Sequence, residues 1–204
     1  MNNREDHWEN VYQTKQLTEV SWYEPVPQTS IAMISSFKLP KDAAIIDIGG
    51  GDSLLADHLL AEGYTNITVL DVSASAIERA KTRLGERAAK INWIVSDMLL
   101  LNDAHKYDLW HDRAAFHFLT AVPDQQTYLE TAHRNLNPGG YCIISTFAVN
   151  GPEKCSGLPV QQYDENTLSA LFSPYFDKIS CFAKAHTTPF NTVQQFIYCS
   201  FRNR

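Results

Sequence analysis

Residues 44–53, AIIDIGGGDS, decide the fold that this chain is expected to adopt. The apolar run that ends at Ile48 predicts a buried strand, and the spacing of leucines after Ser53 predicts a helix. The glycines between them can take positive φ and let a ligand approach the main chain, while the helix start offers unpaired N–H groups. This pattern predicts a crevice for a nucleotide-like cofactor at the end of the first strand.

Aspartates also follow the next two predicted strands. Asp71 ends the apolar run 67–72, twenty residues after Gly51, and Asp97 follows the run 91–95. Taken singly, each of these two acids is more commonly a helix N-cap. Because the carboxyl ends of parallel strands meet at one edge of a sheet, the two acids together with Asp47 favour a shared ligand site, in which Asp71 accepts hydrogen bonds from ribose hydroxyls.

The glycine pattern separates two classes of cofactor. A dinucleotide-binding turn has a third glycine where this chain has Leu54. The stretch instead resembles the acid-x-Gly-x-Gly turn of class I S-adenosylmethionine (SAM) dependent methyltransferases. That resemblance implies SAM as cofactor and S-adenosylhomocysteine (SAH) as product. The residues expected at the cofactor are Trp22, Asp47, Gly49, Gly50, Gly51, Asp71, Val72, Asp97, Met98 and Asp112.

Strands and helices are predicted to alternate along the chain, which indicates an α/β fold with a doubly wound, mostly parallel seven-stranded sheet. The methyltransferase resemblance implies a Rossmann-like sheet with an antiparallel last strand. Residues 137–140, NPGG, are expected to form a turn. Strands are expected at 45–48, 67–72, 91–95, 107–112, 141–147, 179–183 and 195–201, and helices at 56–62, 75–84, 124–136 and after Asp164.

The length of 204 residues and a hydrophobic content of 44% predict a single domain, 1–204. Residues 1–40 are expected to form N-terminal cap helices, and residues 41–204 the core. The aromatic turn at Trp22 and Tyr23 joins these helices, and in the family that the chain resembles such helices close over the cofactor. Aromatic faces near a sulfonium add cation–π attraction.

Composition disfavours several other functions. A formal charge of −6 without a basic run makes nucleic acid a poor partner. No apolar run approaches the roughly eighteen residues of a membrane span, and the first residues do not form a signal peptide. Four cysteines without a C-x-x-C pair are expected to be reduced thiols, with no metal site and a cytoplasmic location. The oligomeric state is left open.

The segment after the fourth strand carries the candidate catalytic residues. Asp112 is expected to orient or deprotonate an amine, and His117 to serve as a base for a thiol or hydroxyl. A helix-surface histidine is the favoured alternative for His117, and a structural ion pair is the alternative for Arg113. Tyr23 is expected to orient the acceptor nitrogen. The irregular segment 148–162, which contains Cys155, is a candidate active-site loop or a plain connection.

Motifs throughout the chain resemble one branch of the class I methyltransferases, the protein-lysine methyltransferases of elongation factor 1A and citrate synthase. The motifs are HWENVY, VSWYE, DIGGGDS, VLDVS, WIVSDM, YDLWHDR and NPGGY. The resemblance implies direct displacement at the sulfonium methyl by a nitrogen, such as that of a protein lysine. A small-molecule N-, O- or S-methyltransferase and a SAM-binding protein without turnover remain alternatives.

Overall fold

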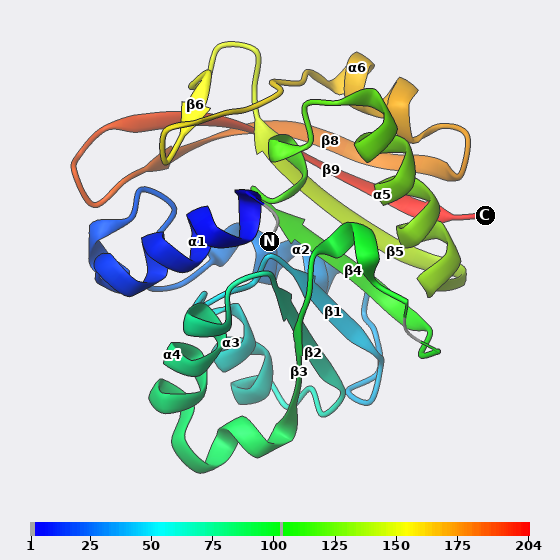
Figure 1. Cartoon of the computed structure of the whole chain (residues 1–204). Coiled ribbons are helices and arrows are strands. Elements are labelled where there is room, and N and C mark those ends of the chain that lie inside the picture. Colours follow the sequence, from blue (N-terminus) through cyan, green and yellow to red (C-terminus); the bar gives the residue numbers. More distant parts are fainter. Residues whose placement is uncertain (1–2, 103) are drawn as a thin grey trace.

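The computed structural model describes residues 3–102 and 104–204, which form a doubly wound α/β fold (Figure 1). The sheet has seven strands in the order β3-β2-β1-β4-β5-β9-β8. Strands β1 to β5 are parallel, and β9 runs antiparallel to both β5 and β8. The predicted fold class, with its antiparallel last strand, is confirmed. The strands are β1 (Ile45–Ile48), β2 (Ile67–Asp71), β3 (Ile91–Val95), β4 (Tyr107–Arg113), β5 (Leu136–Phe147), β8 (Phe176–Thr187) and β9 (Val193–Asn203).

Helices cover both faces of the sheet because its central strands are apolar on both sides. Ile45 on β1 packs with α2 and α3, whereas its neighbour Ile46 packs with α5 and α6. Such strands need a covering layer on each face, which explains why their sequences are continuously apolar. The helices are α1 (Asn3–Thr14), α2 (Gln28–Ser36), α3 (Leu55–Ala61), α4 (Ala74–Leu84), α5 (Val122–Asn135) and α6 (Glu165–Phe172).

Helix α1 docks beside α4 through polar contacts (Figure 1). Glu9 accepts hydrogen bonds from the Ser73 hydroxyl at 2.7 Å and from the Ser75 amide at 3.2 Å. Arg79 donates to the carbonyl oxygens of Tyr12 at 2.8 Å and Lys15 at 2.6 Å. A cation thus satisfies carbonyls that the end of α1 leaves unpaired.

Two local expectations are wrong. Residues 137–140 are not a separate turn but the irregular start of β5, where the pairing with β4 shifts register and Gly139 has φ of 75°. Cys181 and Cys199 form a disulfide rather than two reduced thiols. They are directly paired residues on β8 and β9, a juxtaposition that their separation of 18 residues does not reveal.

The segment 148–162 is more ordered than expected from its composition. It contains a short hairpin of β6 (Lys154–Cys155) and β7 (Leu158–Pro159), which buries the Cys155 side chain. Within residues 3–102 and 104–204, no helix has the length and apolar character that crossing a bilayer requires. The same residues contain no cluster of histidine, cysteine and acidic side chains that could hold a metal ion.

We expect Phe172→Ala to lower the free energy of unfolding by about 3 to 5 kcal/mol, because the truncation leaves a cavity in the core. Phe172 is fully buried and stacks on Phe201 with ring centroids 4.7 Å apart. Urea denaturation measures the loss. Phe190→Ala is the matched control, since Phe190 is 57% exposed, and its effect should stay within about 0.5 kcal/mol. Equal losses in the two variants would contradict this account of the core.

Candidate functional site

The turn after β1 has no room for side chains. Gly49 and Gly51 adopt positive φ, 63° and 47°, which favours glycine. A Cβ atom added to Gly49 would lie 2.7 Å from the Cβ of Ala115, and one added to Gly51 would lie 2.7 Å from the Tyr12 hydroxyl. The turn therefore passes closely between α1 and the segment that follows β4.

Asp47 is held beneath this turn by a chain of hydrogen bonds. Its Oδ1 lies 2.7 Å from His111 Nδ1, and His111 Nε2 lies 2.8 Å from the Ser30 hydroxyl. All three side chains are buried. The other carboxylate oxygen would be 2.6 Å from a Cβ at Gly50, so a side chain there would collide with Asp47. The acid is thus fixed by β4 and α2.

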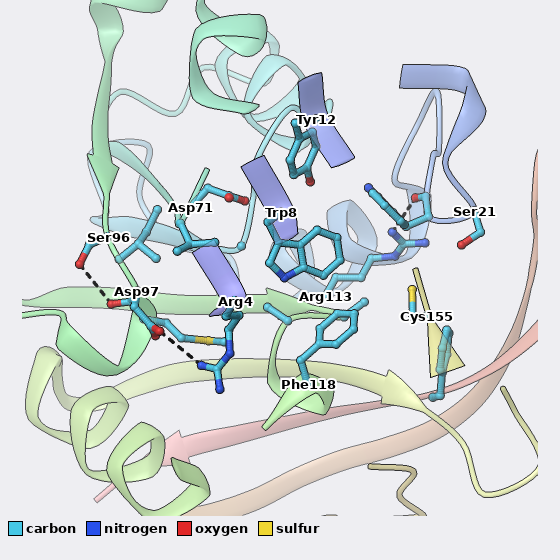
Figure 2. A pocket seen from close by; sticks show the side chains of 18 of the residues that line it. Arg4, Trp8, Tyr12, Ser21, Asp71, Ser96, Asp97, Arg113, Phe118 and Cys155 are labelled. Atoms are coloured by element: carbon cyan, nitrogen blue, oxygen red, sulfur yellow. Dashed lines mark hydrogen bonds and ion pairs between the residues drawn. The ribbon is translucent and has the colours of Figure 1, made fainter. Parts of the chain in front are cut away.

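A cavity runs along the carboxyl edge of the sheet, with about 780 Å³ of space outside protein atoms, including its open mouth. Figure 2 shows Asp71, Ser96 and Asp97 on one side of it and Ser21 and Cys155 on the other. Six of the predicted cofactor residues line this cavity: Trp22, Gly49, Asp71, Val72, Asp97 and Met98. Asp47 and Gly50 line a neighbouring cavity, which shares Tyr12, Trp22, Gly49 and Arg113 with the first.

Asp71 is a buried carboxyl group at the end of β2. Its Oδ1 accepts a hydrogen bond from the Ser73 amide at 2.8 Å, and its Oδ2 would lie 3.0 Å from a Cβ at Gly51. Burial raises the pKa of Asp71 to about 7, and the nearby charges of Asp52 and Asp47 act in the same direction. A ligand that brings hydrogen-bond donors would stabilise the charged form of this group.

Asp97 caps the short helical turn that follows β3 and also holds the start of α1. It accepts a hydrogen bond from the Leu99 amide at 2.9 Å. Arg4 forms an ion pair with Asp97 at 3.3 Å and a second one with Asp124 at 3.1 Å. Met98 lies next to Asp97 in the lining of the cavity. The N-cap alternative and the site interpretation therefore both describe Asp97.

Aromatic side chains form the middle of the cavity. Trp8 of α1 makes edge contacts with Phe118 and Trp22, with ring centroids 5.0 Å and 5.7 Å apart. Phe147 and Phe196, from β5 and β9, lie 4.8 Å apart and continue this lining. Trp8 belongs to the motif HWENVY, which predicted a lid. The phenylalanines carry no sequence signal beyond their place in strands and turns.

Arg113 ties the N-terminal segment to the sheet (Figure 2). It donates to the carbonyl oxygen of Trp22 at 3.0 Å and forms an ion pair with Glu24 at 3.0 Å. Glu24 also lies 3.1 Å from His186 Nδ1. Burial opposes the charge on Glu24, but the hydrogen bond from His186 and the positive charge of Arg113 outweigh it and lower the pKa. Glu24 therefore stays ionised and remains bound to Arg113 and His186.

Asp112, a predicted catalytic and cofactor residue, lies outside the lining of both cavities. Its Oδ1 accepts hydrogen bonds from the amides of Ala115 at 2.9 Å and Phe116 at 3.1 Å, and its Oδ2 accepts one from the Tyr128 hydroxyl at 2.6 Å. It is completely buried, and burial raises its pKa to about 6. Asp112 therefore stabilises the turn after β4, and its position does not support direct contact with a methyl acceptor.

The other two predicted catalytic residues also lie outside the main cavity. His117 is fully buried, and its Nδ1 accepts a hydrogen bond from the Phe147 amide at 3.3 Å. Burial, with the charge of Arg113, lowers the pKa of His117 to about 3, so this imidazole does not take up a proton near neutral pH. Tyr23 lines the neighbouring cavity and not the main one. Asp112, His117 and Tyr23 are therefore not brought together on the main cavity.

Comparison with known proteins connects this geometry to a family. Residues 45–140, just under half of the chain, match the family described as methyltransferase domain. EEF1A lysine methyltransferase 2 of Mus musculus is 28% identical over 158 residues, which cover 69% of this chain and 64% of that protein. A ubiquinone biosynthesis O-methyltransferase of Rickettsia akari is 30% identical over 119 residues, 58% of this chain and 46% of that protein. The matches span less than two thirds of either relative.

Solved structures share the whole fold. The N-methyltransferase NodS of Bradyrhizobium japonicum, in complex with SAH, superposes with a TM-score of 0.70 at 17% identity and covers 97% of this chain and 99% of its own. A structure from work on the conversion of a disulfide bond into a thioacetal group in echinomycin biosynthesis superposes with a TM-score of 0.79 at 20% identity. The match covers 97% of this chain and 92% of that chain. The domain match over residues 45–140 and the shared fold make the chain similar to SAM-dependent methyltransferases.

We expect Asp112→Asn to remove a pH-dependent cost of folding. Because the pKa of Asp112 is raised from 3.8 to about 6, the unfolded chain releases this proton first as the pH rises, and the free energy of unfolding falls across that window. The variant lacks this loss, so its stability relative to the native protein should rise by about 2.4 kcal/mol between pH 4 and pH 7. Urea denaturation at both pH values measures the difference, and parallel pH dependences would contradict it.

Proposed function

We propose that this protein transfers the methyl group of SAM to an acceptor held beside the segment that follows β4. The observation that carries the proposal is one cavity that joins the acids at the ends of β2 and β3, the glycine turn after β1 and an aromatic wall from α1, the turn after β4, β5 and β9. Asp71 would accept hydrogen bonds from the ribose hydroxyls, and Asp97 and Met98 would lie at the adenine.

The remaining parts of SAM have matching partners. Its methionine portion would lie over the turn at Gly49 and Gly50, which approach closely because neither carries a side chain. Asp47, which His111 and Ser30 hold in place, lines the neighbouring cavity and would face the ammonium group. The indoles of Trp8 and Trp22 offer π faces to the positively charged sulfonium. The residues therefore fit the cofactor in both shape and charge.

The chain's own residues would position and shield the reacting groups. When bound, SAM supplies a methyl group that is already activated. Helix α1 covers the cavity with Trp8 and Tyr12, and Phe118, Phe147 and Phe196 exclude water from its far end. Alignment of the nucleophile with the methyl carbon is the main contribution left to the protein.

An enclosed aromatic lining favours a small molecule over an exposed protein side chain. A protein lysine is the second candidate, supported by the similarity to EEF1A lysine methyltransferase 2.

A cytoplasmic location, and a partner other than nucleic acid or membrane, remain predictions from composition.

The test is to incubate the purified protein with methyl-labelled SAM and cell extract, and then to separate macromolecules from small molecules. Label in the small-molecule fraction is the expected result. Label in protein would favour the lysine alternative instead. No transfer into either fraction, despite measured SAM binding, would contradict methyl transfer and indicate a SAM-binding protein without turnover.

We expect Asp71→Asn to weaken SAM binding by roughly 10- to 100-fold, because the amide loses charge-assisted hydrogen bonds to the ribose hydroxyls. Isothermal titration calorimetry with SAM and SAH measures this. Asp177→Asn is the control, since Asp177 is an exposed acid on β8 that pairs with Arg204, and its affinity should match the native one. Unchanged affinity in Asp71→Asn would contradict the proposed cofactor position.

A further inference from the structure

The far end of the main cavity indicates which kind of acceptor the protein takes, an inference that rests on the function proposed above. We call this end the acceptor chamber. It is lined by Ser21, Arg113, Phe118, Phe147, Cys155 and Phe196. These residues come from the ends of β4 and β5, the helical turn after β4, the start of β9, the β6–β7 hairpin and the N-terminal segment. In the sheet, β1 separates β4 from β2, so the chamber lies away from Asp71 and Asp97.

The walls of the chamber are mostly apolar. The rings of Phe147 and Phe196 lie 4.8 Å apart, and the ring of Phe118 lies 5.0 Å from that of Trp8, so aromatic side chains form much of the wall. Its polar or charged residues are Ser21, Cys155 and Arg113, and Gln194 also lines the main cavity. This lining suits an acceptor with a compact apolar body.

No side chain of the described residues that line the chamber can take a proton from the acceptor near neutral pH. The thiol of Cys155 stays protonated, because burial raises its pKa to about 11. Two titratable residues near the chamber are also unable to act as its base. Asp112 already accepts three hydrogen bonds, and the pKa of the buried His117 is about 3. Glu24 is an ionised carboxylate already bound to Arg113 and His186.

The charge of the chamber disfavours an ammonium ion. Arg113 is the charged residue of its lining, with the guanidinium 5.5 Å from the ring centroid of Phe196. The partner carboxylate, Glu24, lines the neighbouring cavity instead. A protonated lysine would therefore meet a cation, and the nearby carboxylate of Glu24 is already paired with Arg113 and His186, whereas an anionic nucleophile would meet no like charge in the lining of the chamber.

We propose that the acceptor is a small thiol with an apolar body, which reacts as its thiolate. A thiol ionises to a few per cent at pH 7 without help and is strongly nucleophilic, whereas an alcohol would need a base that the chamber lacks. The thiol first loses its proton to solvent. The thiolate lone pair then forms the new S–CH₃ bond while the methyl–sulfonium bond of SAM breaks, and its electron pair stays on the sulfur of SAH. The products are a neutral thioether and SAH.

The decisive experiment measures kcat/KM against pH for an aryl thiol and an alkyl thiol of similar size, with SAH formation as the readout. The rising limb of each profile should follow the thiol's own ionisation, so that the aryl thiol, which is more acidic, reaches its plateau at lower pH. A limb at the same pH for both thiols would reveal a base on the protein and overturn the proposal.

Acceptors with the same body and a different nucleophile test the choice of atom. The amine and the alcohol that correspond to the alkyl thiol should react at least about 100-fold more slowly in kcat/KM. Comparable rates with the amine would overturn the proposal in favour of nitrogen. If SAM binds in calorimetry while extract label appears on a non-thiol product, this inference fails and the proposed methyl transfer stands; if SAM does not bind, both fail.

Two variants at the ion pair should move the pH profile of kcat, measured at saturating thiol, in opposite directions, because kcat reports ionisation of the bound thiol. Arg113→Met removes the charge that favours the thiolate, so the rising limb of kcat should shift to higher pH and kcat at pH 7 should fall by about 10-fold or more. Glu24→Gln leaves Arg113 without its counter-charge, so the limb should shift to lower pH. If the two substitutions only loosened the N-terminal segment, both variants would lose activity and their pH profiles would not shift in opposite directions. That result would overturn the proposed role of Arg113 in stabilising the thiolate.

Discussion

The site depends on the close packing of main chain at the turn after β1. Gly49 and Gly51 lie so near Ala115, Tyr12 and Asp71 that a single methyl group at either position would collide with a neighbour. The same closeness allows a ligand to approach the backbone at the carboxyl edge of the sheet. The acids after β1 and β2 are therefore held a short distance from that turn, with the aromatic cover of α1 above it.

Access to the cavity distinguishes two buried acids of this region. Asp112 accepts three hydrogen bonds, from the backbone of the next turn and from Tyr128, and it therefore fixes the local structure. Asp71 is also buried but lines the cavity, and burial together with the charges of Asp52 and Asp47 raises its pKa. The first acid supports the site, and the second lies where a ligand can reach it.

Polar contacts join the N-terminal segment to both ends of the cavity. Arg4 reaches Asp97 at the end beyond β3, and Arg113 reaches Trp22 and Glu24 at the acceptor end. Trp8 lies between these two points, against Phe118. The N-terminal segment therefore lines both ends of one cavity, and it would contribute to the proposed cofactor part and to the proposed acceptor chamber.

The sequence by itself determined the sheet, the glycine turn and the acids at the strand ends, because these depend on local patterns: apolar runs, positive φ and a fixed spacing from Gly51 to Asp71. Only the tertiary structure decided which polar groups are free to act. Nothing in the local sequence distinguishes Asp112 from Asp71. Asp112 nevertheless has a structural role, because it accepts hydrogen bonds from Tyr128 and from the backbone of the next turn. Likewise the Cys181–Cys199 disulfide and the pairing of Arg113 with Glu24 join residues that are far apart in the chain. Partners of this kind depend on how strands and loops are packed, and no local pattern encodes them.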